Sequence, residues 1–174
     1  MKKYLLTALI AVFGMSAANA QFEKGTKTVN VKTSGLEVET LSGDGYSERE
    51  VYLGAEGAYF IVDRISVMAE FSIESEKEYD RDDAISTVHL GGGARYYFSD
   101  KGWFAGAGLL AYIDTAGERI SAITGKIEGG YTWYIGDRFY VEPAIQLLKD
   151  YDTGASKVSP LTKFRFTTGF GIKF

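Results

Sequence analysis

The chain of 174 residues contains no cysteine, one histidine and only two prolines. The lack of cysteine excludes a disulfide framework, a thiolate zinc site and a cysteine nucleophile, and a single histidine cannot form a histidine-rich metal site. Cations are also scarce, with 19 Lys and Arg against 23 Asp and Glu. This balance argues against nucleic-acid binding, which needs a basic face. No motif for a nucleotide, metal or redox cofactor is present, so we expect no cofactor.

The composition is rich in apolar, aromatic and glycine residues instead. Hydrophobic residues make up 45% of the chain and charged residues 24%, a balance that excludes a disordered protein. The 21 glycines, 12 tyrosines and 11 phenylalanines disfavour a helical bundle and favour a β-rich fold. The length fits a single domain.

Residues 1–20 have the pattern of a cleaved secretory signal peptide. Lys2 and Lys3 form a positively charged start, residues 4–15 are apolar, and Ala18-Asn19-Ala20 is an Ala-x-Ala cleavage site. A membrane anchor is the alternative, but the apolar run is short for a span. We therefore expect a Sec-exported chain with a signal peptide at 1–20 and one domain at 21–174. No second long apolar run follows, which leaves a periplasmic, secreted or outer-membrane protein.

After this leader, apolar and polar residues alternate with a period of two, as in β-strands that have one apolar face. Eight stretches show the pattern: 26–39, 50–61, 65–74, 87–98, 103–113, 123–135, 139–147 and 163–174. In the first stretch the apolar phase shifts between Val31 and Leu36, and a β-bulge near Ser34-Gly35 would explain the shift. In 103–113 either face could be the apolar one.

The connections between these stretches alternate in length. Asp63-Arg64, residues 99–102 and residues 136–138 are tight polar turns, whereas 41–47, 75–84, 115–119 and 150–162 are longer. This pattern predicts an up-and-down meander with both chain ends at the short-turn end. Outer-membrane barrels have this layout, with short turns in the periplasm and longer loops outside.

Alternation alone does not say which face of the barrel points inward, so a soluble ligand-binding barrel remains an alternative. Aromatic residues crowd the short-turn end on both faces, which favours an interfacial girdle over a plug that closes a soluble barrel. The residues expected in this girdle are Tyr59, Tyr96, Phe98, Trp103, Tyr131, Trp133 and Phe139.

The polar faces carry charges of both signs at mid-strand, together with many glycines. These charges would be solvated on a soluble barrel, but small residues suit a narrow interior that has room only for side chains. Charges inside such a barrel should be paired, because a lone buried charge is costly. The expected polar network of the lumen is Glu56, Glu70, Arg95, Lys126, Glu128, Glu142 and Arg165.

The chain stops in mid-strand on an aromatic residue. Its last residues, with Phe170, Ile172 and Phe174 on one face, resemble the C-terminal signal that outer-membrane barrels present to their assembly machinery. Residues 57–64, Gly-Ala-Tyr-Phe-Ile-Val-Asp-Arg, resemble a strand end and turn of the OmpX-like and OmpA-transmembrane-domain-like family, and the similarity covers about residues 24–174.

The resemblance implies an all-β, eight-stranded antiparallel transmembrane barrel in the bacterial outer membrane. It also implies a monomer whose partners are outer-membrane lipid, lipopolysaccharide, periplasmic chaperones and the barrel-assembly machinery. We expect a non-enzymatic barrel with a packed polar interior, poor conductance, and loops for adhesion or envelope integrity. The charged segment 74–83 could bind a surface ligand or bridge cations to lipopolysaccharide, or it could simply be solvated.

Two further functions stay open as alternatives. Lipid A-modifying enzymes of the PagP and PagL kind carry a histidine near a serine and an acid, and only His89 could serve here; it lacks a His-x-Ser pattern. A small channel for ions or apolar solutes would need a loosened wall, for which Gly91-Gly92-Gly93 and Pro143 are candidates.

Overall fold

The structure is a computed structural model, and it describes residues 22–40, 50–76, 85–114, 119–152 and 162–174. The expected signal peptide and most of the longer connections lie outside these residues. None of the described residues forms a helix that is long and apolar enough to cross a membrane. The strands are β1 (Lys27–Thr40), β2 (Glu50–Val62), β3 (Ile65–Glu76), β4 (Ile85–Tyr97), β5 (Trp103–Asp114), β6 (Arg119–Tyr131), β7 (Trp133–Ile135), β8 (Phe139–Asp152) and β9 (Thr162–Lys173).

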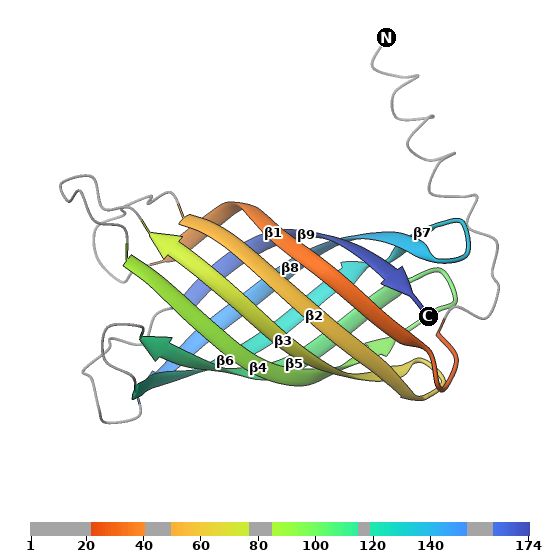
Figure 1. The fold of residues 1–174 in the computed structure, drawn as a ribbon, viewed down its shortest axis with the longest axis horizontal. Helices are drawn as coiled ribbons and strands as arrows, with labels where there is room; N and C mark the ends of the chain where they lie inside the picture. Colours follow the sequence, from red (N-terminus) through yellow and green to blue (C-terminus); the bar gives the residue numbers. More distant parts are fainter. Residues whose placement is uncertain (1–21, 41–49, 77–84, 115–118, 153–161) are drawn as a thin grey trace, which may run out of the picture.

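The strands form one closed antiparallel barrel (Figure 1). Each strand from β1 to β5 pairs with the next, β8 pairs with β6, β7 and β9, and β1 pairs with β9, which closes the wall. β6 and β7 are one run interrupted at Thr132, and both pair with β8 in the same register. The predicted eight-stranded barrel is therefore confirmed.

The interruption between β6 and β7 has a local cause. The neighbouring pairs, Gly130 with Ala144 and Trp133 with Val141, put Tyr131 opposite Pro143 and Thr132 opposite Glu142, and the ladder skips these two positions. Proline has no N–H group and cannot donate to a ladder of hydrogen bonds. Pro143 thus marks a gap in the hydrogen bonding of the wall, while β8 keeps its pairing with β9.

The predicted bulge in the first strand is confirmed. Ser34 pairs with Thr167 and Leu36 with Phe166, so Gly35 is an extra residue on β1. One extra residue reverses the alternation of side chains along a strand. This reversal accounts for the apolar phase shift that the sequence shows between Val31 and Leu36.

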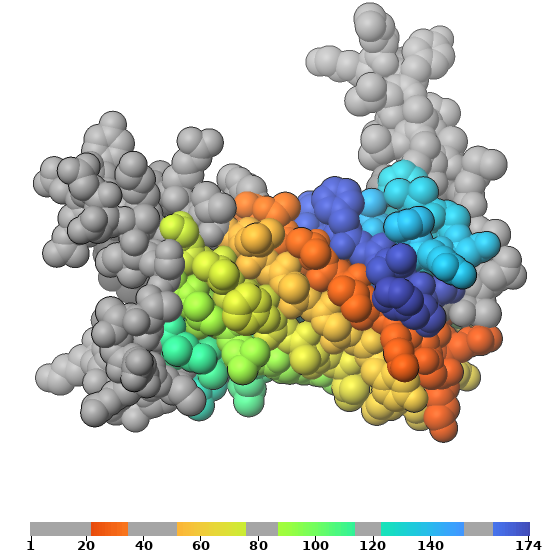
Figure 2. Space-filling model, viewed as in Figure 1, coloured from red at the N-terminus to blue at the C-terminus, as the bar shows by residue number. Residues whose placement is uncertain are grey.

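The two faces of the wall differ sharply in chemistry. Side chains such as Leu53, Leu109 and Ile127 point outward and are 56–61% exposed, whereas Glu56 and Arg95 point inward and are 3% exposed. On β5, which the sequence left open, Leu109 is exposed and Leu110 is buried. Figure 2 shows the outer surface of β9, β1, β2 and β3, which lie side by side across this view. The barrel is inverted relative to a soluble one.

The short turns and the C-terminus lie together at one end of the barrel, called here the turn end (Figure 1). Lys27 and Phe174 are joined by two backbone hydrogen bonds of 2.8 and 3.2 Å. The turns need left-handed backbone at Arg64 (φ 65°), Gly102 (φ 102°) and Gly136 (φ 72°). The opposite end, where the strands border the undescribed connections 41–49, 77–84, 115–118 and 153–161, is called the loop end.

Candidate functional site

The lumen is built in successive layers, because inward positions follow one another every second residue along each strand. The layer at the turn end is aromatic. It consists of Phe22, Phe60, Tyr97, Phe104, Tyr134, Tyr140 and Ala144, all at most 7% exposed. From the sequence we favoured a girdle over a plug for the aromatic residues at this end. Outward-facing rings lie at this end, and the inward ones pack together across the lumen as a plug would.

A layer of charged side chains, centred on Arg95, follows the aromatic layer. It begins two residues closer to the loop end, at Arg95 after Tyr97 on β4 and at Glu142 after Tyr140 on β8. Its Nε lies 2.5 Å from Oε1 of Glu128, and its Nη1 lies 2.7 Å from Oε1 of Glu56 and 3.1 Å from Oε1 of Glu142. The planar guanidinium presents several donors at once, which suits contact with carboxylates from three strands. The guanidinium carbon also stands 4.5 Å above the ring of Phe104, which joins the charged layer to the aromatic one.

Two lysines complete this ion network. Lys32 Nζ lies 2.6 Å from Oε2 of Glu56, and Lys126 contacts Glu70 and lies 3.6 Å from Oε2 of Glu128. The network therefore contains three cations and four carboxylates, each at most 3% exposed: Lys32, Arg95, Lys126, Glu56, Glu70, Glu128 and Glu142.

Glu142 is the network carboxylate for which no contact with a lysine is given above, and neutral groups donate hydrogen bonds to it. Glu142 accepts hydrogen bonds from the hydroxyl of Thr132 (2.8 Å) and the amide of Asn30 (3.2 Å), in addition to Arg95. Tyr52 likewise donates to Glu70 at 2.8 Å. Buried charges need hydrogen bonds as well as countercharges, and both are supplied here.

All seven residues expected in the lumen face it, but they are not one cluster. Arg165 pairs with Glu74, which lies nearer the loop end. Sequence reasoning missed Lys32, because the phase shift obscured the alternation of its strand. Before the bulge, however, Thr28, Asn30 and Lys32 alternate with Val29 and Val31, and that pattern could have placed Lys32 inside.

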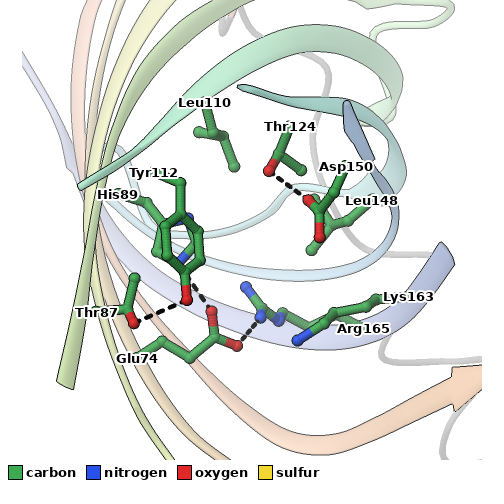
Figure 3. Close-up of a pocket in the computed structure, with 10 residues that line it drawn as sticks. All are labelled: Glu74, Thr87, His89, Leu110, Tyr112, Thr124, Leu148, Asp150, Lys163 and Arg165. Atoms are coloured by element: carbon green, nitrogen blue, oxygen red, sulfur yellow. Dashed lines mark hydrogen bonds and ion pairs between the residues drawn. The ribbon is translucent and has the colours of Figure 1, made fainter. Parts of the chain in front are cut away.

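At the loop end the lumen opens into a small cavity of about 40 Å³ (Figure 3). It is lined by Glu74, Thr87, His89, Leu110, Tyr112, Thr124, Leu148, Asp150, Lys163 and Arg165. The side chains hold one another in place: Arg165 contacts Glu74, Thr124 donates to Asp150 at 2.5 Å, and Thr87 and Tyr112 share a hydrogen bond of 3.1 Å. The cavity is large enough for a few waters.

His89 lies in the wall of this cavity and is 7% exposed. Its Nε2 is 2.9 Å from Oε2 of Glu74, and its ring packs edge-on against Tyr112 at 4.9 Å. Within the described part of the chain, His89 Nδ1 has no hydrogen-bond partner. Thr87 lies two residues before His89 on β4, and Tyr112 lies opposite His89 on β5. Their hydroxyl groups are hydrogen-bonded to each other. The described residues also contain no group of three or more acidic, histidine or cysteine side chains placed to hold a metal.

The expected girdle residues lie around the turn end, with one departure. Tyr59, Tyr96, Phe98, Trp103 and Phe139 are 42–61% exposed. Trp133 is half-buried. Tyr131 is only 7% exposed, because Trp103 faces it directly across the β5–β6 pair and packs against its ring at 5.0 Å. At the chain end Phe170 and Phe174 are 61% and 70% exposed, and Ile172 is half-buried.

A closed eight-stranded meander with an apolar exterior and an ionic interior is the fold of the small outer-membrane β-barrels. The solved structures to which the chain is similar include three such proteins. Neisserial surface protein A has a TM-score of 0.62 at 12% identity, over 86% of this chain and 96% of that one. The N-terminal barrel domain of Pseudomonas aeruginosa OprF has a TM-score of 0.57 at 15% identity, over 87% and 98%.

The third is Ail, the attachment invasion locus protein of Yersinia pestis, with a TM-score of 0.56 at 10% identity, over 87% of this chain and 99% of that one. No family model matches the sequence, and no curated protein matches it. At these identities the likeness defines the fold alone.

Proposed function

We propose that the chain is an integral outer-membrane β-barrel protein without enzymatic activity, with a packed ionic lumen and with recognition confined to its loop end. The observation that carries the proposal is the inversion of the two faces. Apolar side chains such as Leu109 and Ile127 are 61% exposed, while seven charged side chains of the ion network are at most 3% exposed. Water would favour the opposite arrangement, and a hydrocarbon exterior favours this one.

The dimensions of the wall support insertion in a bilayer. The long strands have 12 to 14 residues, and a tilted transmembrane strand needs about 9–11. The exposed aromatic residues at the turn end lie where an interface with lipid headgroups would be. We assign that end to the periplasm because the short turns of outer-membrane barrels face it. The partners we propose are outer-membrane lipid and lipopolysaccharide, together with the periplasmic chaperones and assembly machinery that would insert the barrel.

The position of His89 supports a non-enzymatic barrel over a lipid A-modifying one. A catalytic histidine needs a nucleophile within hydrogen-bond reach and access to its substrate. His89 points into a cavity of about 40 Å³ rather than toward the lipid-facing side, and the nearby hydroxyls are bonded to each other. Replacing His89 with alanine should leave the lipid A profile of the cell unchanged in mass spectrometry.

The packing of the lumen supports a poor channel. Arg95, Glu128 and Glu142 come from different strands, meet inside the lumen, and are at most 3% exposed. Moving an ion past them would break contacts that the buried charges need. We expect no reproducible large conductance in planar bilayers, and such a conductance would support the channel alternative.

The loop end remains the surface for recognition. Ail, which shares the fold, has also been solved in complex with the heparin analogue sucrose octasulfate. The present chain matches that structure with a TM-score of 0.53. The segment 74–83 of the present chain is predominantly acidic in sequence, which disfavours a polyanion and favours a cationic or cation-bridged surface as its ligand.

The experiment that tests the proposal is gel mobility of the outer-membrane fraction with and without boiling. A folded membrane barrel resists detergent and migrates differently until it is heated, so we expect a heat-dependent shift in that fraction. Recovery of the protein in the soluble periplasmic fraction without a shift would refute the membrane assignment and favour a soluble ligand-binding barrel.

A further inference from the structure

One ring in the lumen does not come from the barrel wall. Phe22 precedes β1, belongs to no strand, and is nevertheless 4% exposed. Its ring stacks on Tyr97 with centroids 4.1 Å apart and planes 22° apart. It also meets the rings of Phe60 and Tyr134, each at 5.9 Å. These three partners come from β2, β4 and β7, so Phe22 fills the space between separate parts of the wall.

The backbone around Phe22 is bound to the first turn of the barrel. The carbonyl of Phe22 accepts a hydrogen bond from the N–H of Arg64 at 2.7 Å, and the N–H of Gly25 donates to the carbonyl of Phe60 at 2.8 Å. The N–H of Lys24 donates to the carboxylate of Asp63 at 2.9 Å. Arg64 has the left-handed backbone that a residue with a Cβ disfavours, and its N–H is the group that binds the carbonyl of Phe22.

We propose that the segment Phe22–Gly25 is a plug, which closes the lumen at the turn end so that water enters only from the loop end. Two rings connect the plug to the ion network: Phe22 stacks on Tyr97, Tyr97 packs against Phe104, and Phe104 lies under the guanidinium of Arg95. A dry layer at this point strengthens the ion contacts above it, because electrostatic interactions weaken in water. The assignment of this end to the periplasm rests on the proposed function, but the closure itself does not.

The closure can be tested with an introduced thiol, because the chain has no cysteine of its own. Ser66 is a suitable site: it is 0% exposed, and its hydroxyl has no hydrogen-bond partner among the described residues. In the strand register it pairs with Phe60 and Arg95, at the boundary of the aromatic layer and the ion network. The Ser66→Cys variant is therefore close in size to the native residue and places a thiol just behind the plug.

The measurement is the rate at which a small charged methanethiosulfonate reagent labels this thiol in the folded barrel, followed by mass spectrometry. We expect slow labelling of Ser66→Cys and labelling faster by about tenfold or more in Phe22→Ala/Ser66→Cys, because access no longer requires the plug to open. Unfolding in denaturant should give complete labelling of both variants. Phe22→Leu/Ser66→Cys, which keeps most of the apolar volume, should label at an intermediate rate and carries the test if the alanine variant does not fold.

The matched control is Phe98→Ala/Ser66→Cys, which removes a ring of the same end that is 53% exposed and points outward. Its rate should equal that of Ser66→Cys alone. Equal rates with and without the Phe22 ring, or fast labelling of Ser66→Cys itself, would overturn the plug. A soluble protein without a heat-dependent gel shift would instead refute the membrane assignment, and the labelling rates would still decide the closure.

Discussion

Replacing Arg95 with methionine should be among the most destabilising single changes in the lumen. The substitution keeps a long side chain but removes the cation that contacts Glu56, Glu128 and Glu142 within 2.5–3.1 Å. Removing one partner from a buried ion cluster leaves uncompensated charge and typically costs about 3–5 kcal/mol. We expect a loss of that size in the free energy of unfolding, measured by denaturant titration of the refolded barrel in detergent micelles.

The charge balance of the network predicts a partial rescue. Native network carboxylates exceed network cations by one, and Arg95→Met raises the excess to two. Adding Glu142→Gln restores the native excess, and the single carbonyl oxygen of the glutamine can still accept the hydrogen bond from Thr132. The double variant should therefore recover part of the lost stability.

An exposed ion pair provides the control. Arg64 and Asp100 lie 2.7 Å apart with side chains 43% and 63% exposed, and such pairs contribute about 0–1 kcal/mol. Asp100→Asn should therefore change stability by no more than that. If Arg95→Met also costs less than about 1 kcal/mol, the network is solvated and the reasoning that the lumen is dry is refuted.

Three further variants test other parts of the structure. Leu109→Arg, on the outward face, should cost about 2–4 kcal/mol in vesicles, while Asp137→Arg in a turn should cost little; equal effects would argue against a lipid-facing wall. Gly102→Ala should destabilise the barrel by more than about 1 kcal/mol, since its Cβ would lie 2.2 Å from the carbonyl of Thr132, whereas Gly136→Ala, with similar backbone and open space, should cost less. Phe174→Ala should lower the heat-modifiable fraction in cells but not refolding in vitro, because this ring is 70% exposed; equal losses in both would assign it a structural role.

Much of the site could be predicted from residue order, because a strand exposes alternate residues to opposite faces. This rule placed Glu56, Glu70 and Arg95 on the polar faces of their strands without any knowledge of the barrel. It could not say which charges meet, because contacts across a lumen join strands that are distant in sequence. Arg165 illustrates the limit: it faces inward as expected but pairs with Glu74, since its height along the barrel depends on the register of β9 against its neighbours.

Tyr131 shows a second limit of reasoning from alternation. Its position on β6 predicts an outward ring, but exposure also depends on the residue opposite in the next strand. Trp103 occupies that position and covers the ring. The residue opposite a given side chain depends on the register between two strands, and the alternation of apolar and polar residues within one strand does not determine that register.

The sequence alone is sufficient for the strand count, the turn positions, the bulge at Gly35 and the two-faced wall, because each depends on residues close together in the chain. The tertiary structure was needed to show that the apolar face is the outer one and that Lys32 joins the ion network. It was also needed to place Phe22 inside the lumen, because nothing in its local sequence distinguishes a plug from an ordinary residue before a strand. These features depend on closing the sheet, which brings β1 against β9 and encloses the space where distant side chains meet.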